Sequence, residues 1–167
     1  MTIQENNAYH NMHYRVKKEK SYVGSSICND WYDRGTFIEW RNNSNTPYKD
    51  GYSLDKDIKV YGNMVYSPDT CMYVPHGLNL LFRELPNKNT GIKGVYHQDN
   101  CINPYRVILS FDGKHSTHPL NRKCFPTLED AQNAAISIWK WHVSIWYDRM
   151  MASGEDDIAV HLIKYLY

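Results

Sequence analysis

Three consecutive titratable residues, Asp55, Lys56 and Asp57, stand at the end of an alternating segment in the first half of this 167-residue chain. A carboxylate there could bind a divalent cation or act as a general base, and a lysine could hold a phosphate as a point charge. The preceding alternation of polar and apolar residues indicates a strand, and carboxylates two residues apart are common on exposed turns. The segment by itself therefore also fits a solvated strand end.

A basic region in the second half could bind phosphates. Residues 89–126 carry five basic side chains against two acidic ones, although the whole chain is nearly neutral, with 19 Lys and Arg against 18 Asp and Glu. In PYRVILSFDG, Arg106 and Ser110 fall on the face opposite Val107 and Leu109. Arginine can pair with guanine or with a phosphate. A solvated strand face carries charges too, so that alternative stays open.

The elements around the acidic segment follow from hydrophobic spacing and turn residues. The spacing predicts helices over residues 8–18, 31–40 and 75–84, the last beginning with Pro75. Extended pieces are expected over residues 52–60 and 63–67, separated by a turn at Gly62-Asn63. The order strand, strand, helix therefore surrounds the three titratable residues.

The second half shows a simpler pattern. Three strands are expected over residues 91–99, 104–113 and 114–125, with a hairpin turn at Asp112-Gly113. One long helix follows to residue 152, with Thr127 as its cap. Its predicted inward face comprises Leu128, Ala131, Ala135, Ile138, His142 and Ile145. We therefore expect an α+β fold with two domains, residues 1–88 and 89–167, and a three-stranded antiparallel sheet packed on a long helix in the second.

Composition narrows the classes of protein. The chain lacks the ~18 consecutive apolar residues of a membrane span and has a polar beginning, so we expect a cytoplasmic protein without membrane partners. Its four cysteines form no C-x-x-C pair, which predicts reduced, mostly buried thiols and disfavours a structural zinc site. The chain is rich in aromatic residues (14 Tyr, 5 Trp and 4 Phe), which serve cores, protein interfaces and nucleobase stacking alike.

The first half resembles a divergent HNH, or His-Me finger, nuclease motif. The series C-x-x-W from Cys28 to Trp31, then Phe37 and Trp40, LDKD and YSP-x-x-C is similar to a group of phage-encoded HNH-type proteins. The family fold is two strands and a helix around one divalent ion. The resemblance implies that Asp55 and Asn79 bind Mg²⁺ or another divalent ion and that the chain cleaves DNA.

This sequence departs from the family at the general base. The family has a histidine after the metal-binding acid, whereas this chain has Lys56. An ordinary lysine has a pKa near ~10.4 and keeps its proton at neutral pH. Cleavage would then need Asp57 or Lys56 in place of the missing histidine, while a protonated Lys56 suits binding of a phosphate without cutting.

The second half resembles an Apetala-type DNA-binding domain, which places a three-stranded sheet in the major groove with one helix behind it. The matching positions are Gly94, Val95, Tyr105, Arg106, Val107, Leu109, Gly113, Lys114, Leu120, Phe125, Glu129, Asp130 and Ala131. Two departures are a wider turn over residues 121–124 and the apolar Ile108. The candidate DNA-binding residues are Lys93, Gln98, Arg106, Ser110, Lys114, Arg122 and Lys123.

These patterns lead to one functional hypothesis and two alternatives. The first is a phage or mobile-element protein that binds double-stranded DNA, derived from a homing endonuclease, with or without Mg²⁺-dependent nicking. The second is a catalytically inactive relative that binds a host or defence-system protein in the host cytoplasm. The third is a structural or assembly protein, which predicts neither bound metal nor DNA affinity. The sequence leaves the target site and the oligomeric state open.

Overall fold

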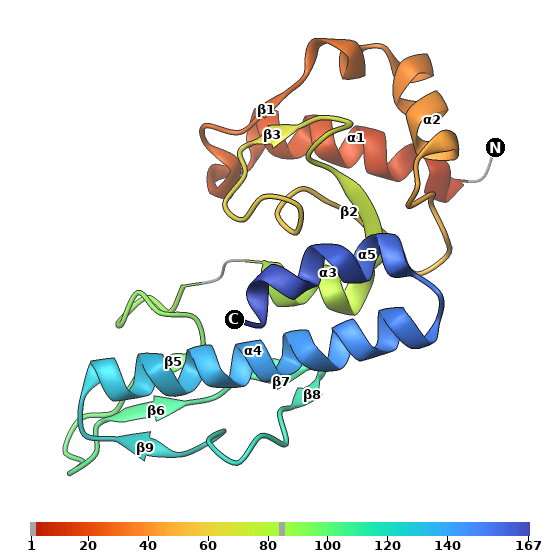
Figure 1. Cartoon of the computed structure of the whole chain (residues 1–167). Helices are drawn as coiled ribbons and strands as arrows, with labels where there is room; N and C mark the ends of the chain where they lie inside the picture. The colour runs from red at the N-terminus through yellow and green to blue at the C-terminus, as the bar shows by residue number, and fades with distance from the viewer. Residues whose placement is uncertain (1–2, 84–85) are drawn as a thin grey trace. The chain divides into compact units, whose positions relative to one another are not determined.

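The computed structural model describes residues 3–83 and 86–167, and the chain divides into two compact units, residues 1–79 and 80–167. The chain is 44% helical and 15% strand, which confirms a mixed α+β fold (Figure 1). The division falls inside helix α3 (His76–Phe82), whereas the sequence predicted a boundary after residue 88. No helix in the described part of the chain combines the length and apolar character needed to cross a membrane.

Unit 1 pairs its strands in an order that the sequence did not predict. Strand β2 (Tyr52–Asp55) is antiparallel to β4 (Met72–Pro75), and β1 (Ser26–Ile27) is parallel to β3 (Val65–Tyr66). The expected extended piece over residues 52–60 thus ends at Asp55, because the chain turns there. The order β2, β4, α3 still places two paired strands before a helix.

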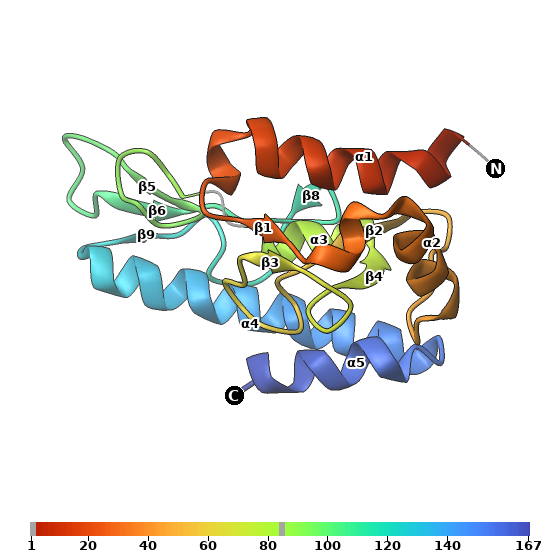
Figure 2. The same ribbon diagram turned by 90° about the horizontal axis from the view of Figure 1, so that it is seen from above.

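The helices of unit 1 form in the predicted regions, but their bounds differ from the predicted ones. Helix α1 (Ile3–Lys18) lies beside β1 in both views (Figures 1 and 2). The helix expected over residues 31–40 is split into a 3-10 turn, η2 (Asn29–Tyr32), and α2 (Arg34–Asn43). The split arises because the Asp33 side chain accepts a hydrogen bond from the Thr36 amide and caps α2. A further 3-10 turn, η1 (Lys20–Tyr22), follows α1. Helix α3 ends at Phe82, and residue 84, the predicted end of this helix, lies outside the described residues.

The aromatic residues of the C-x-x-W and F-x-x-W series form the core of unit 1. Trp31 and Phe37 are fully buried, and their rings meet edge to face at 5.0 Å. Trp40 lies 4.6 Å from the Trp31 ring, centroid to centroid. Met12 of α1 is in the same cluster. These residues therefore hold α1, η2 and α2 together, and their spacing reflects packing rather than chemistry.

Unit 2 contains the expected three-stranded sheet. Strands β5 (Val95–His97), β6 (Tyr105–Val107) and β9 (Cys124–Phe125) form an antiparallel sheet in that order. Helix α4 (Leu128–Ala152) lies across one face of it, and α5 (Asp156–Leu162) runs beside α4, followed by η3 (Ile163–Tyr165) (Figures 1 and 2).

Two local signals in unit 2 are confirmed. The hairpin of β7 (Ser110–Phe111) and β8 (Lys114–His115) turns at Asp112 and Gly113, whose φ angles are 50° and 73°. Thr127 caps α4 by accepting a hydrogen bond from the Asp130 amide. The predicted strands 104–113 and 114–125 are each interrupted, because the hairpin forms its own small sheet.

All four cysteines are free thiols, but they are not mostly buried. Cys71 is fully buried and Cys28 is half-buried, whereas Cys101 and Cys124 are exposed. Burial raises the pKa of Cys71 to about 12, so this thiol stays protonated and unreactive at neutral pH.

Candidate functional site

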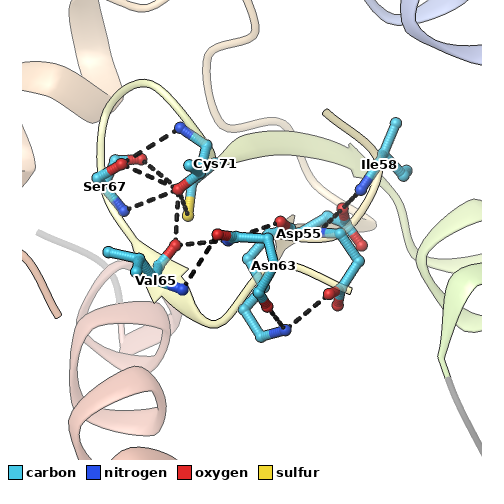
Figure 3. Close-up of polar contacts among 9 residues, drawn as sticks. Asp55, Ile58, Asn63, Val65, Ser67 and Cys71 are labelled. Carbon is cyan, nitrogen blue, oxygen red and sulfur yellow. Dashed lines mark hydrogen bonds and ion pairs between the residues drawn. The ribbon is translucent and has the colours of Figure 1, made fainter. Parts of the chain in front are cut away.

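The acidic segment forms a tight turn around a buried carboxyl group (Figure 3). Asp55 is only 2% exposed, and one of its oxygens accepts hydrogen bonds from the amides of Asp57 at 2.9 Å and Ile58 at 2.7 Å. Burial raises its pKa to about 7 although both hydrogen bonds favour the charged form. Asp55 therefore closes the turn that ends β2, and its carboxyl group holds a proton for much of the time at neutral pH.

Lys56 and Asp57 are engaged within the same loop. The Lys56 ammonium lies 2.7 Å from an Asp57 carboxylate oxygen and donates to the Asn63 carbonyl at 2.6 Å. The side-chain amide of Asn63 donates to the backbone carbonyls of Lys56 at 3.0 Å and Val65 at 2.6 Å (Figure 3). The Lys56 side chain is 12% exposed. These contacts give Lys56 and Asp57 a role in holding the loop between β2 and β3.

Asn79 lies in a cleft of unit 1 with a volume of about 330 Å³. The residues that line the cleft come from α1, the segment 48–54, β3, β4 and α3: Ala8, Asn11, Met12, Arg15, Tyr48, Gly51, Tyr52, Ser53, Leu54, Tyr66, Tyr73, His76 and Asn79. Asp55 is not among them, so the cleft does not bring together the two residues predicted to share a metal ion. Within residues 3–83 and 86–167, no group of three or more His, Cys, Asp and Glu side chains is arranged to hold a metal ion.

The cleft also contains polar residues that are not among the predicted site residues. His76 Nδ1 lies 2.9 Å from Ser53 Oγ, and Arg15 reaches the cleft from α1. Residues 8, 11, 12 and 15 share one face of α1, which the i, i+3, i+4, i+7 spacing could have indicated. The pairing of His76 with Ser53 had no such signal, since it depends on the register of β2 and β4.

The sheet of unit 2 presents Arg106 on the face opposite α4. Val95 and Val107 belong to the core beneath α4, so alternation directs Arg106 to the other face. Its cross-strand neighbours are Tyr96 on β5 and Cys124 on β9. The Arg106 Nε atom is buried and has no hydrogen-bond partner among the described residues. A central, cationic side chain thus lies on this outer face.

The other predicted DNA-binding residues are dispersed over unit 2. Ser110 and Lys114 are exposed on the β7–β8 hairpin, Arg122 and Lys123 are exposed just before β9, and Gln98 is half-buried after β5. Lys93 differs, because its ammonium donates to the carbonyls of Leu80, Leu81 and Arg83 at the end of α3. Lys93 therefore caps a helix.

Acidic residues near the sheet have basic partners. Asp112 forms an ion pair with Arg149 of α4, and Asp99 lies 3.3 Å from His97 Nδ1. These pairs leave the charges of Arg106, Lys114, Arg122 and Lys123 without compensation from these two acids.

Comparison with protein-family models, curated proteins and solved structures finds no match to this chain. The functional assignment therefore depends on the geometry of the sheet and the cleft.

Proposed function

We propose that this protein binds double-stranded DNA through the outer face of the β5–β6–β9 sheet, and that unit 1 is an HNH-derived scaffold that does not cut DNA. The observation that carries the proposal is the position of the cationic Arg106 on the central strand of this face, between Tyr96 and Cys124. Two-stranded and larger β ribbons fit the major groove, where arginine pairs with guanine. A phage or mobile-element origin is part of this proposal and rests on the sequence resemblance.

Charge and shape support DNA as the ligand of this face. Tyr96, beside Arg106, is 43% exposed and offers an amphipathic ring. Arg122 and Lys123 are exposed just before the edge strand β9, where they could contact phosphates beside a base contacted by Arg106, and Lys114 is exposed on the separate β7–β8 hairpin. This combination of a central base-reading group and peripheral cations is typical of specific DNA binding.

The surroundings of Asp55 support binding without cleavage. Strands β2 and β4 followed by α3 have the element order of an HNH finger. The residue at the position of the general base, Lys56, is paired with Asp57, and the metal-binding candidate Asp55 is buried in a turn. Activation of water needs an accessible group that can accept a proton, whereas the two candidates, Lys56 and Asp57, are engaged with each other in an ion pair and Asp55 is buried.

Replacing Arg106 with glutamine is expected to weaken binding to duplex DNA about tenfold, because one charge-assisted contact is lost. Fluorescence anisotropy with a labelled random duplex, repeated over a series of salt concentrations, measures the affinity. Lys164→Gln, which removes the same charge from η3, is the control and should have little effect.

Two outcomes would overturn the proposal. An absence of salt-dependent binding by the wild-type protein would remove DNA as the ligand and favour the host-protein alternative. Nicking of supercoiled DNA with Mg²⁺ that is lost in Asp55→Asn would restore the nuclease hypothesis. We expect DNA binding and no nicking.

A further inference from the structure

The cleft of unit 1 has the size of a small-molecule site and a lining without acidic residues. Its volume of about 330 Å³ lies at the lower end of the range for ligand pockets. The lining contains Arg15, His76, two asparagines, a serine and four tyrosines, and neither Asp nor Glu. A site with a cation and amide donors but no carboxylate favours an anionic ligand.

Several donors in the cleft are available to a ligand. The Arg15 guanidinium lies over the Tyr22 ring, 5.8 Å from its centroid, and within the described residues it forms no ion pair. Asn11 and Asn79 make no side-chain hydrogen bond within the described part of the chain. Arginine and amide groups together can bind the oxygens of a phosphate from several directions.

The His76–Ser53 pair adds a directed donor. Nδ1 of His76 is 2.9 Å from Ser53 Oγ, which leaves Nε2 for another partner. When Ser53 donates to Nδ1, or when the ring is protonated, Nε2 carries a hydrogen. A phosphate oxygen in the cleft could accept that hydrogen.

Tyrosines supply the apolar part of the same cleft. Tyr48 and Tyr52 are half-buried, and Tyr66 and Tyr73 are buried more deeply. The Arg41 guanidinium lies 4.4 Å from the centroid of the Tyr48 ring and fixes its position. Tyrosine rings stack on any nucleobase, because every base offers a flat face whatever hydrogen-bonding groups it carries.

We propose that this cleft binds a nucleotide, with the phosphate at Arg15 and Asn79 and the base against the tyrosines. The ligand could be a free nucleotide or a single nucleotide of a strand, since both offer one phosphate and one flat ring. The site lies wholly in unit 1 and does not depend on duplex binding by the sheet of unit 2.

Isothermal titration of the full chain with deoxyadenosine monophosphate tests the proposal. Inorganic phosphate and deoxyadenosine should each bind at least about tenfold more weakly than the nucleotide, because each supplies only one of the two contacts. Arg15→Gln should reduce nucleotide affinity about tenfold. The matched control is Lys17→Gln, which removes one charge from an exposed position of the same helix and should change nothing.

A second variant keeps the test decisive if Arg15→Gln fails to fold. Asn79→Asp places a carboxylate in the cleft, which should weaken nucleotide binding at least about tenfold by repulsion. A cleft for a metal ion would instead bind its ligand more tightly in this variant. Arg106→Gln should bind the nucleotide as the wild type does, which separates this site from the sheet.

A single-stranded oligodeoxyadenylate distinguishes the two sources. Tighter binding than the mononucleotide, with the same dependence on Arg15, identifies a nucleotide within a strand, and equal or weaker binding identifies a free nucleotide. The proposal is wrong if millimolar nucleotide does not bind, or if Lys17→Gln reduces binding as much as Arg15→Gln.

Discussion

Unit 1 of the wild-type protein is expected to lose stability as the pH rises from about 4 to about 7, and replacing Asp55 with asparagine is expected to abolish this loss. Burial raises the pKa of this carboxyl group to about 7, against 3.8 when it is solvated. Between these values the folded state keeps a proton that the unfolded state has released, so the free energy of unfolding falls with rising pH. A difference of about three pH units corresponds to about 4 kcal/mol.

Asparagine is suited to this test because it preserves the acceptor of the turn. Its side-chain oxygen can still accept from the amides of Asp57 and Ile58, which Asp55 binds at 2.9 and 2.7 Å. Hydrogen exchange of buried amides in β4, measured on the full chain from pH 4 to 8 and corrected for intrinsic exchange rates, reports the stability of unit 1. Asp69→Asn removes an exposed carboxylate of the same unit and should keep the wild-type profile.

The same experiment with Mg²⁺ separates a structural carboxyl from a metal ligand. A metal ion bound by Asp55 would displace its proton and stabilise unit 1 most at neutral pH. We expect Mg²⁺ to leave the wild-type profile unchanged. A profile that is identical in Asp55→Asn and the wild type would show that burial does not hold a proton on this group.

Features set by neighbouring residues could be predicted from the sequence. The Asp112-Gly113 turn and the Thr127 cap each depend on a few adjacent residues, and both are present. The long helix and the three strands of unit 2 likewise followed from periodicity. Their signals are local, so one sequence carries them in full.

Features set by distant contacts could not be predicted in the same way. The partner of β2 is β4, about 20 residues away, and the sequence contains no marker of that register. The burial of Asp55 follows from this pairing, and so does the contact of Ser53 with His76. A D-x-D segment therefore has the same appearance in sequence whether its first carboxylate faces solvent or closes a buried turn.

Unit 2 of the wild-type protein is expected to lose stability as the pH falls, and replacing His142 with glutamine is expected to remove this loss. His142 is 1% exposed, lies 2.7 Å from Ser116 Oγ through Nε2 and stacks on Phe111. Burial lowers its pKa to about 4 from 6.5, and the nearby His118 and Lys93 lower it further, while Asp112 acts against them. Between about pH 4 and pH 6.5, His142 therefore stays neutral in the folded state but is protonated in the unfolded state.

The stability of unit 2 should consequently fall as the pH drops from about 6.5 to about 4, by about 3 kcal/mol for a difference of about 2.5 pH units. Hydrogen exchange at Val107 in β6 reports this unit, and His115→Gln, at an exposed position, is the control. Because Asp55 and His142 act with opposite signs, each variant should flatten the profile of its own unit alone. If one substitution flattened both profiles, the two units would unfold together; if a substitution left the profile of its own unit unchanged, that buried group would not be the cause of the pH dependence.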